Sequence, residues 1–333
     1  MHEIEAGSRG FEFAMRLRRA FRAIGIVVVA GVFLLATSAW FMGSLLIEPQ
    51  NHTVQVPAGF SAETVTIPGV AHAIAGWWVD AGNGTPVVLL VHGLGADRSS
   101  MVPRAELLKE HGISSLLIDL QGEGETRGEA ITMGYRESGD VIAARDWIRM
   151  KAPGQKIGVI GTSLGGASVL LAPQPAGFDA VVLESVYPRI GRAVENRIRM
   201  QLKFLAPVLT PLLLVQLEPR LHISVSELEP IRWIGKRGAP VLVAAGSRDR
   251  HTTLEESREL FDAAAEPKWL WIVEGAKHQD MLAFDPKGYE ENVVGFLVDT
   301  LKPVATTEKK RRFRRFVRAS KSLISDAPRT IYL

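Results

Sequence analysis

The feature that most constrains the fold of this 333-residue chain is the turn GTSLGG at residues 161–166, between the apolar stretch KIGVI and a helical segment. Side chains at Gly161 and Gly165 would collide across so sharp a strand-to-helix turn, so only very small residues fit there. Such a turn lifts the hydroxyl of Ser163 above the edge of a sheet. It also places this hydroxyl at a helix N-terminus, where backbone N–H groups favour developing negative charge.

On both sides of this turn, apolar runs bounded by turn residues alternate with helical-period segments, the pattern of a parallel sheet covered by helices. Strands are predicted at residues 73–79, 87–91, 114–119, 156–161, 180–184, 241–245 and 269–273. Helices are predicted at residues 103–111, 136–150, 164–172, 254–265 and 289–301. The predicted fold class is therefore α/β, with a mostly parallel central sheet flanked by helices.

Near the N-terminus, residues 24–47 form an uncharged apolar stretch, and about 20 such residues cross the hydrocarbon core of a bilayer. Arginines precede this stretch at residues 9, 16, 18, 19 and 22, whereas residues 48–97 contain no Lys or Arg. The positive-inside rule then predicts a cytoplasmic N-terminus and an extracytoplasmic domain, periplasmic or extracellular. The alternative is a cleaved signal peptide, since small residues occur at positions 36–39, but the apolar run continues beyond them.

Residues 188–238 interrupt the alternation and contain the run LKFLAPVLTPLLLVQLEP. With two prolines inside it, this run is a poor membrane span, so an inserted helical cap is expected. The expected division of the chain is a cytoplasmic N-terminus (1–23), a transmembrane anchor (24–47), a first part of the core (48–187), the cap (188–238), a second part of the core (239–303) and a basic tail (304–333).

The composition excludes several classes of site. The chain has no cysteine, which rules out disulfides, thiolate metal sites and a cysteine nucleophile. The net charge of +3 comes from the C-terminal tail, which is either a basic amphipathic helix on anionic lipid or a disordered segment. Because basic residues are not interleaved with stacking aromatics in the core, no nucleic-acid partner is expected. No phosphate-binding glycine pattern follows a strand, so no nucleotide cofactor is expected.

Two side chains that complete a catalytic triad follow Ser163. Asp249 comes just after the strand VLVAA, and His278 follows the strand WLWIV, so both lie on loops at the carboxyl edge of the predicted sheet. A serine hydroxyl is a weak nucleophile until a base takes its proton, and a carboxylate orients that base. We predict His278 as general base and Asp249 as orienting acid, with Glu184 as an alternative acid and Asp280 as a loop-capping or surface carboxylate.

The turn His92-Gly93-Leu94 stands at the end of an earlier predicted strand. In this position the backbone N–H of Leu94 is expected to form an oxyanion hole together with the N–H of Leu164, which follows the serine. His92 is expected to be a structural turn residue.

With these residues in place, residues 73–301 resemble the α/β-hydrolase superfamily, above all its bacterial lysophospholipase-like and serine-aminopeptidase-like members. The motifs that carry the resemblance are GTSLGG with Gly161, Gly165 and Gly166, the HGLG turn with Gly93, GSRDR and GAKH. The segment DLQGEGET at residues 119–126 departs from the pattern, because relatives often have an arginine or histidine there.

The resemblance implies a serine hydrolase without metal or organic cofactor. We expect hydrolysis of an ester or related acyl bond through an acyl-enzyme on Ser163, with a small-molecule acyl or lipidic ester as substrate. The membrane is the other expected partner, through the N-terminal helix and the basic tail. Two alternatives stay open: a peptidase or amidase that uses the same triad, and a hydrolase-fold protein that binds without turnover.

Overall fold

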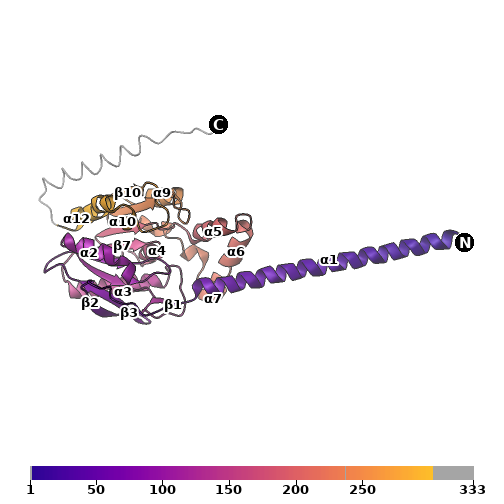
Figure 1. The fold of residues 1–333 in the computed structure, drawn as a ribbon, viewed down its shortest axis with the longest axis horizontal. Coiled ribbons are helices and arrows are strands. Elements are labelled where there is room, and N and C mark those ends of the chain that lie inside the picture. Colours follow the sequence, from indigo (N-terminus) through magenta and orange to yellow (C-terminus); the bar gives the residue numbers. More distant parts are fainter. Residues whose placement is uncertain (1, 237, 303–333) are drawn as a thin grey trace, which may run out of the picture.

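The computed structural model describes residues 2–236 and 238–302, so the basic tail predicted at residues 304–333 lies outside the described part. The chain begins with the long helix α1 (His2–Ile47), which projects from a compact domain of strands and helices (Figure 1). Within Met15–Ile47 of α1, the most apolar stretch of 18 residues has a mean hydropathy of 2.3, and the helix is long and apolar enough to cross a membrane. The helix thus extends N-terminally well beyond the predicted span.

The central sheet has eight strands in the order β10-β9-β8-β7-β4-β5-β3-β2. All neighbours are parallel except at one side, where β3 pairs antiparallel with β5 and with β2. The strands are β2 (Glu63–Pro68), β3 (Ala73–Val79), β4 (Val87–Val91), β5 (Ser114–Ile118), β7 (Ile157–Thr162), β8 (Ala180–Glu184), β9 (Val241–Gly246) and β10 (Lys268–Val273). A small second sheet pairs β1 (Gln50–Asn51) with β6 (Glu123–Gly124). The mostly parallel sheet that the sequence predicts is confirmed.

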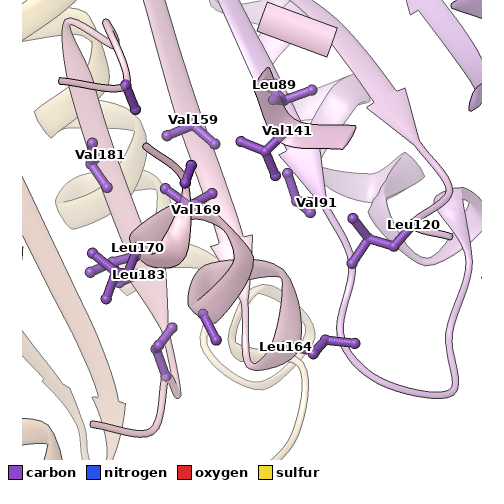
Figure 2. Close-up of a cluster of buried hydrophobic side chains, with 14 of the residues drawn as sticks. Leu89, Val91, Leu120, Val141, Val159, Leu164, Val169, Leu170, Val181 and Leu183 are labelled. Atoms are coloured by element: carbon purple, nitrogen blue, oxygen red, sulfur yellow. The ribbon is translucent and has the colours of Figure 1, made fainter. Parts of the chain in front are cut away.

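Helices cover both faces of this sheet, as its almost continuously apolar strands require. One hydrophobic cluster joins the sheet to α3 (Glu137–Lys151), α4 (Leu164–Leu171) and α9 (Leu254–Ala263). Figure 2 shows side chains of α4, among them Val169 and Leu170, beside Val159 of β7 and Leu183 of β8. The second cluster joins the other face to α2 (Val102–Glu110) and α12 (Gly295–Leu301).

Every strand and helix predicted in the core is present, with bounds shifted by a few residues. The predicted helix at 289–301 is in fact three consecutive pieces, α11 (Pro286–Tyr289), a π-helical turn (Glu290–Val294) and α12. The strands β1, β2 and β6 were not predicted from the sequence. The short α10 (Met281–Phe284) was not predicted either.

The segment between β8 and β9 contains no strand in its described residues and forms four α-helices and a short 3-10 helix (Val225–Glu227), as expected of an insertion. The α-helices are α5 (Ile190–Gln201), α6 (Ala206–Leu214), α7 (Leu217–Leu221) and α8 (Ile231–Ile234). We call α5–α7 and their connections, residues 190–221, the helical insertion. In Figure 1 the helical insertion lies at the end of the domain from which α1 projects.

The C-terminal part of α1 packs directly on the helical insertion. Gly43 permits the close approach, because a Cβ there would lie 2.2 Å from Oε1 of Gln216. The amide of Gln216 donates to the carbonyl oxygen of Ala39 at 3.0 Å, and the guanidinium of Arg220 lies 3.9 Å from the ring centroid of Trp40. Arg220 also donates to the hydroxyl of Ser44 at 2.8 Å. The apolar helix and the folded domain are therefore joined by specific contacts.

Candidate active site

The turn between β7 and α4 has the sharp geometry that the sequence predicts. Ser163 adopts φ +49° and ψ −110°, a conformation that is strained for a residue with a side chain. A Cβ on Gly161 would lie 2.6 Å from Cα of Gly166, and a Cβ on Gly165 would lie 2.4 Å from the carbonyl oxygen of Val91. Both glycines are needed because backbone touches backbone on each side of the turn.

The same turn is anchored to the neighbouring strand β8. The backbone N–H of Ser163 donates to the carbonyl oxygen of Glu184 at 2.8 Å, and the hydroxyl of Thr162 donates to the carboxylate of the same residue at 3.0 Å. These bonds hold the strained turn against the end of β8. Ser163 is mostly buried there, with an exposed fraction of 5%.

The loops that carry Asp249 and His278 are bonded to each other. The N–H of Arg248 donates to the carbonyl oxygen of Ala276 at 2.8 Å. Gly246 makes this approach possible, because a Cβ there would lie 2.5 Å from the same oxygen. The parallel pairing of β9 with β10 therefore continues into the two loops.

The carboxylate of Asp249 and the imidazole of His278 form a hydrogen-bonded pair, with Oδ2 and Nδ1 2.8 Å apart. Burial alone would raise the pKa of Asp249. Hydrogen bonds from His278 and from the backbone N–H groups of Thr252 and His251 outweigh this effect and hold the pKa of Asp249 below its usual value. Asp249 is therefore ionised at neutral pH. Because Asp249 engages Nδ1, Nε2 is the ring nitrogen of His278 that has no hydrogen-bond partner among the described residues.

Ser163, Asp249 and His278 follow β7, β9 and β10, which are parallel strands of one sheet. The carboxyl ends of parallel strands meet at one edge, so all three predicted residues lie on loops at the same edge of the domain.

The predicted oxyanion residues lie at this edge as well. A Cβ on Gly93 would lie 3.6 Å from Cβ of Ser163, so the turn after β4 touches the turn after β7. His92 fixes the first of these turns, since its Nδ1 donates to the carbonyl oxygen of Gly93 at 2.8 Å and its Nε2 accepts from the N–H of Leu120 at 3.0 Å. Complete burial lowers the pKa of His92, consistent with a neutral, structural histidine. Leu94 and Leu164 stand on these two adjacent turns.

Glu184, the alternative acid, is occupied by other partners. Arg104 of α2 approaches its carboxylate with two nitrogens, at 2.7 and 3.3 Å, and the hydroxyl of Tyr289 donates to it at 2.5 Å. Arg104 and Glu184 are both almost completely buried. Of the two candidate acids, Asp249 is the one hydrogen-bonded to His278.

Arg104 connects the buried carboxylate to the loop of His278. Its other terminal nitrogen donates to Asp280 at 2.7 Å, two residues after the histidine. Asp280 also accepts from the N–H of Ala283 at the start of α10, so the loop-capping role expected for it is confirmed. The role of Arg104 was not predicted. The only sign of it in the sequence is that a charged residue stands next to the apolar positions of α2.

A second residue that the sequence analysis missed is Glu123, in the segment that departs from the family pattern. Its side chain is almost completely buried, accepts from the N–H of Gly95 and leaves Oε2 without a hydrogen-bond partner among the described residues. Burial, reinforced by the nearby carboxylates of Glu137 and Asp119, raises its pKa to about 8. Glu123 is therefore protonated at neutral pH beside the turn that contains Leu94.

His251 stands two residues after Asp249 and is not one of the predicted triad residues. In the structure its ring lies against that of His278, with centroids 4.8 Å apart, and its backbone N–H donates to Asp249. The amide of Asn196 in the helical insertion donates to the carbonyl oxygen of His251 at 3.1 Å. His251 thus links the helical insertion to the Asp–His pair.

Comparison with known proteins agrees with this fold. A family model described as serine aminopeptidase, S33, matches residues 83–232. An uncharacterised protein of Mycobacterium tuberculosis is 30% identical over 252 residues, which cover 74% of this chain and 81% of that protein. The esterase Pf2001 of Pyrococcus furiosus has a TM-score of 0.64 at 22% identity, covering 77% of this chain and 99% of the esterase. A dienelactone hydrolase from Anabaena variabilis has a TM-score of 0.54 at 20% identity, covering 73% and 99%.

A mostly parallel sheet with a serine on a strained strand-to-helix turn and an Asp–His pair at the same edge defines a hydrolase fold. The chain belongs to the α/β-hydrolase superfamily.

The buried ion pair leads to a first prediction. Replacing Arg104 with Met leaves the carboxylate of Glu184 buried without its cation, so the free energy of unfolding should fall by about 3–5 kcal/mol. The matched control is Arg189→Met, which removes an exposed ion pair of 2.6 Å to Glu259 and should cost about 1 kcal/mol at most. Chemical denaturation of the full chain in detergent measures both. Equal destabilisation by the two substitutions would contradict the role given to Arg104.

Glu123 gives a second prediction, on the pH dependence of stability. The unfolded chain releases this proton near pH 4.5, whereas the folded chain keeps it until about pH 8. Raising the pH across this window therefore favours unfolding, and the loss levels off above pH 8. In Glu123→Gln this contribution is absent, so thermal midpoints should fall less between pH 5 and pH 9 than in the wild type, by about 5 °C or more. Parallel pH profiles of the two proteins would refute the assignment.

Proposed function

We propose that this protein is a serine hydrolase that cleaves an ester or related acyl bond through an acyl-enzyme on Ser163. The observation that carries the proposal is the hydrogen-bonded pair of Asp249 and His278 at the sheet edge where Ser163 sits on a strained turn. The backbone N–H groups of Leu94 and Leu164 are proposed as the oxyanion hole. Support comes from the contact between their turns and from solved α/β hydrolases of the same fold.

In the proposed reaction, Nε2 of His278 takes the proton of Ser163 Oγ while this oxygen attacks the carbonyl carbon of the ester. Asp249 fixes the tautomer through Nδ1 and stabilises the imidazolium that forms. Two backbone N–H groups are proposed to stabilise the tetrahedral oxyanion, each contributing roughly 3–4 kcal/mol. His278 then returns the proton to the leaving alkoxide, which departs as the alcohol. Water, deprotonated by His278, releases the acid and restores Ser163.

The second candidate is a peptidase or amidase that uses the same residues. The observation that favours it is the match of residues 83–232 to a family described as serine aminopeptidase. The proton returned by His278 would then go to a leaving amine. A third candidate, a binding protein without turnover, is disfavoured because both the strained serine and the ionised acid are retained.

We further propose that α1 anchors the protein in a membrane, with the N-terminus in the cytoplasm and the catalytic domain outside. The length and mean hydropathy of Met15–Ile47 support the span, and the arginines before residue 24 support the orientation. The packing of Ala39 and Gly43 on the helical insertion favours retention of α1 over its removal as a signal peptide. The basic tail is proposed as an additional lipid contact.

The catalytic proposal predicts the behaviour of two substitutions. A fluorophosphonate probe should label the wild type but not Ser163→Ala. Asp249→Asn should lower kcat by about 10³–10⁴-fold, because the imidazole loses its orienting anion. The matched control is Asp146→Asn on α3, which changes a half-exposed carboxylate paired with Arg145 and should leave kcat unchanged. Absence of labelling in the wild type would favour the binding protein.

Substrate comparison separates the first two candidates. The purified full chain in detergent is offered p-nitrophenyl acyl esters and aminoacyl p-nitroanilides at matched concentrations. Ester turnover that disappears in Ser163→Ala supports the esterase. Turnover of the anilides alone would replace it with the amidase.

The membrane proposal predicts the labelling of a single cysteine. Because the chain has no native cysteine, Met150→Cys on α3 gives a unique exposed thiol. A membrane-impermeant maleimide should label it in intact spheroplasts, and the protein should fractionate with the membranes. Labelling only after lysis would reverse the orientation, and a soluble product beginning near residue 40 would remove the anchor.

A further inference from the structure

The helical insertion carries an exposed apolar patch. It consists of large side chains on and beside α6, with exposed fractions between 46% and 93%: Leu202, Phe204, Leu205, Val208 and Val215. Lys203 is the one charged residue between positions 202 and 217. Large apolar side chains grouped at the surface of a folded domain mark an interaction site, because leaving them in water is unfavourable. We call these five residues the α6 patch.

The position of α6 relative to α1 indicates what covers the α6 patch. The two helices pack against each other, and Gln216, two residues after α6, contacts Gly43 of α1. In Figure 1, α6 lies alongside α1, on the side of the domain from which the long helix projects. The α6 patch is therefore held next to the apolar helix that is proposed to cross the bilayer.

The depth of the lipid boundary follows from α1. A span of about 20 residues that begins at Ile24 ends near Gly43, within one helical turn of Trp40. Trp40 then stands at the lipid–water boundary, where tryptophan is enriched, and the guanidinium of Arg220 on α7 lies over its ring. Placing α7 at this boundary brings the adjoining α6 to the lipid surface. The long side chain of Lys203 can reach the headgroups from there.

An apolar cavity opens between the same helices. Its lining includes Gly43 and Leu46 of α1, Val194 of α5, Leu214 of α6, Leu217 of α7 and Met133 of the core. The carbonyl oxygen of Met133 accepts a hydrogen bond of 2.8 Å from the hydroxyl of Tyr187.

Tyr187 connects this cavity to the turn of the nucleophile. The residue before it, Val186, packs on the turn so closely that a Cβ on Gly166 would lie 2.1 Å from its Cγ2. Met133, which lines the cavity, is thus linked through Tyr187 and Val186 to the turn of Ser163.

From this arrangement we propose that the α6 patch is immersed in the lipid bilayer beside α1, and that the cavity behind it receives the acyl chain of a lipid-borne ester. The proposal of immersion rests on the patch, on the packing of α6 against α1 and on the proposed membrane span of α1. The proposal of the substrate class rests on the proposed function. Together they make the helical insertion a second membrane-contacting element through which an amphiphilic ester reaches Ser163 without crossing water.

The first test is independent of activity and uses the absence of native cysteine. Phe204→Cys and, as matched control, Val70→Cys carry a nitroxide spin label; Val70 is an apolar residue with an exposed fraction of 96% in the turn between β2 and β3. The full chain is placed in phosphatidylcholine–phosphatidylglycerol nanodiscs. The label at position 204 should be accessible to oxygen and protected from a water-soluble nickel chelate, and the label at position 70 should show the opposite. Circular dichroism checks that both variants are folded.

Equal access of the nickel chelate to both labels would overturn the immersion. Spin–spin broadening at position 204 that disappears on dilution with unlabelled protein would overturn it as well, because a second copy of the chain would then cover the α6 patch.

The second test concerns the substrate. The double variant Phe204→Asp/Val208→Asp should hydrolyse a long-chain acyl ester in vesicles at least ~10-fold more slowly than the wild type. Its turnover of p-nitrophenyl acetate in water should change less than about twofold. An equal loss on both esters, or no loss on either, would overturn the lipid-borne substrate. If the wild type hydrolyses neither ester, the proposed function fails, while the spin-label result still decides the immersion.

Discussion

The site depends on a contact between backbones. The turn of Ser163 touches the end of β4 at Gly165 and closes on itself between Gly161 and Gly166, with no room for a side chain at any of these glycines. This contact brings the turn of Gly93 beside the serine and forces the serine into its strained conformation. The hydroxyl and the proposed oxyanion donors are consequently positioned by main chain, which reorganises little during a reaction.

Charged side chains are buried below the sheet edge that carries Ser163. Arg104 joins Glu184, at the end of β8, to Asp280, beside the loop of His278. A buried ion pair is a poor source of net stability, since both ions lose their hydration. Its value here is geometric: three elements distant in sequence are held in one arrangement, and the turn of Ser163 is bonded to the same glutamate.

Much of the core could be predicted because the residues that define each of its strands are consecutive in the sequence. Each parallel strand is a short continuous apolar run, and Ser163, Asp249 and His278 each follow such a run, so their common edge can be inferred from order alone. The strand β2, with sequence ETVTIP, was missed because only Val65 and Ile67 of it face the core. Arg104 and Glu123 were missed for another reason. A charged side chain is predicted to be exposed to solvent unless its partner is known. The partner of Arg104 is Glu184, which lies 80 residues further along the chain.

The packing of α1 on the helical insertion was not predicted either. Gly43 lies in an apolar run that gives no sign of a contact, and the hydrogen bond between Gln216 and Ala39 joins residues that are 177 positions apart in the chain. This packing has a consequence for how the protein can move. Arg220 and Gln216 form hydrogen bonds to the last turns of the long helix, so the helix is not joined to the domain by a flexible linker alone. When the helix tilts, the whole domain therefore tilts with it. The helix then sets the orientation of the sheet edge that carries Ser163 and the distance of this edge from the membrane that α1 is proposed to cross. A domain on a flexible linker would not be held in this way.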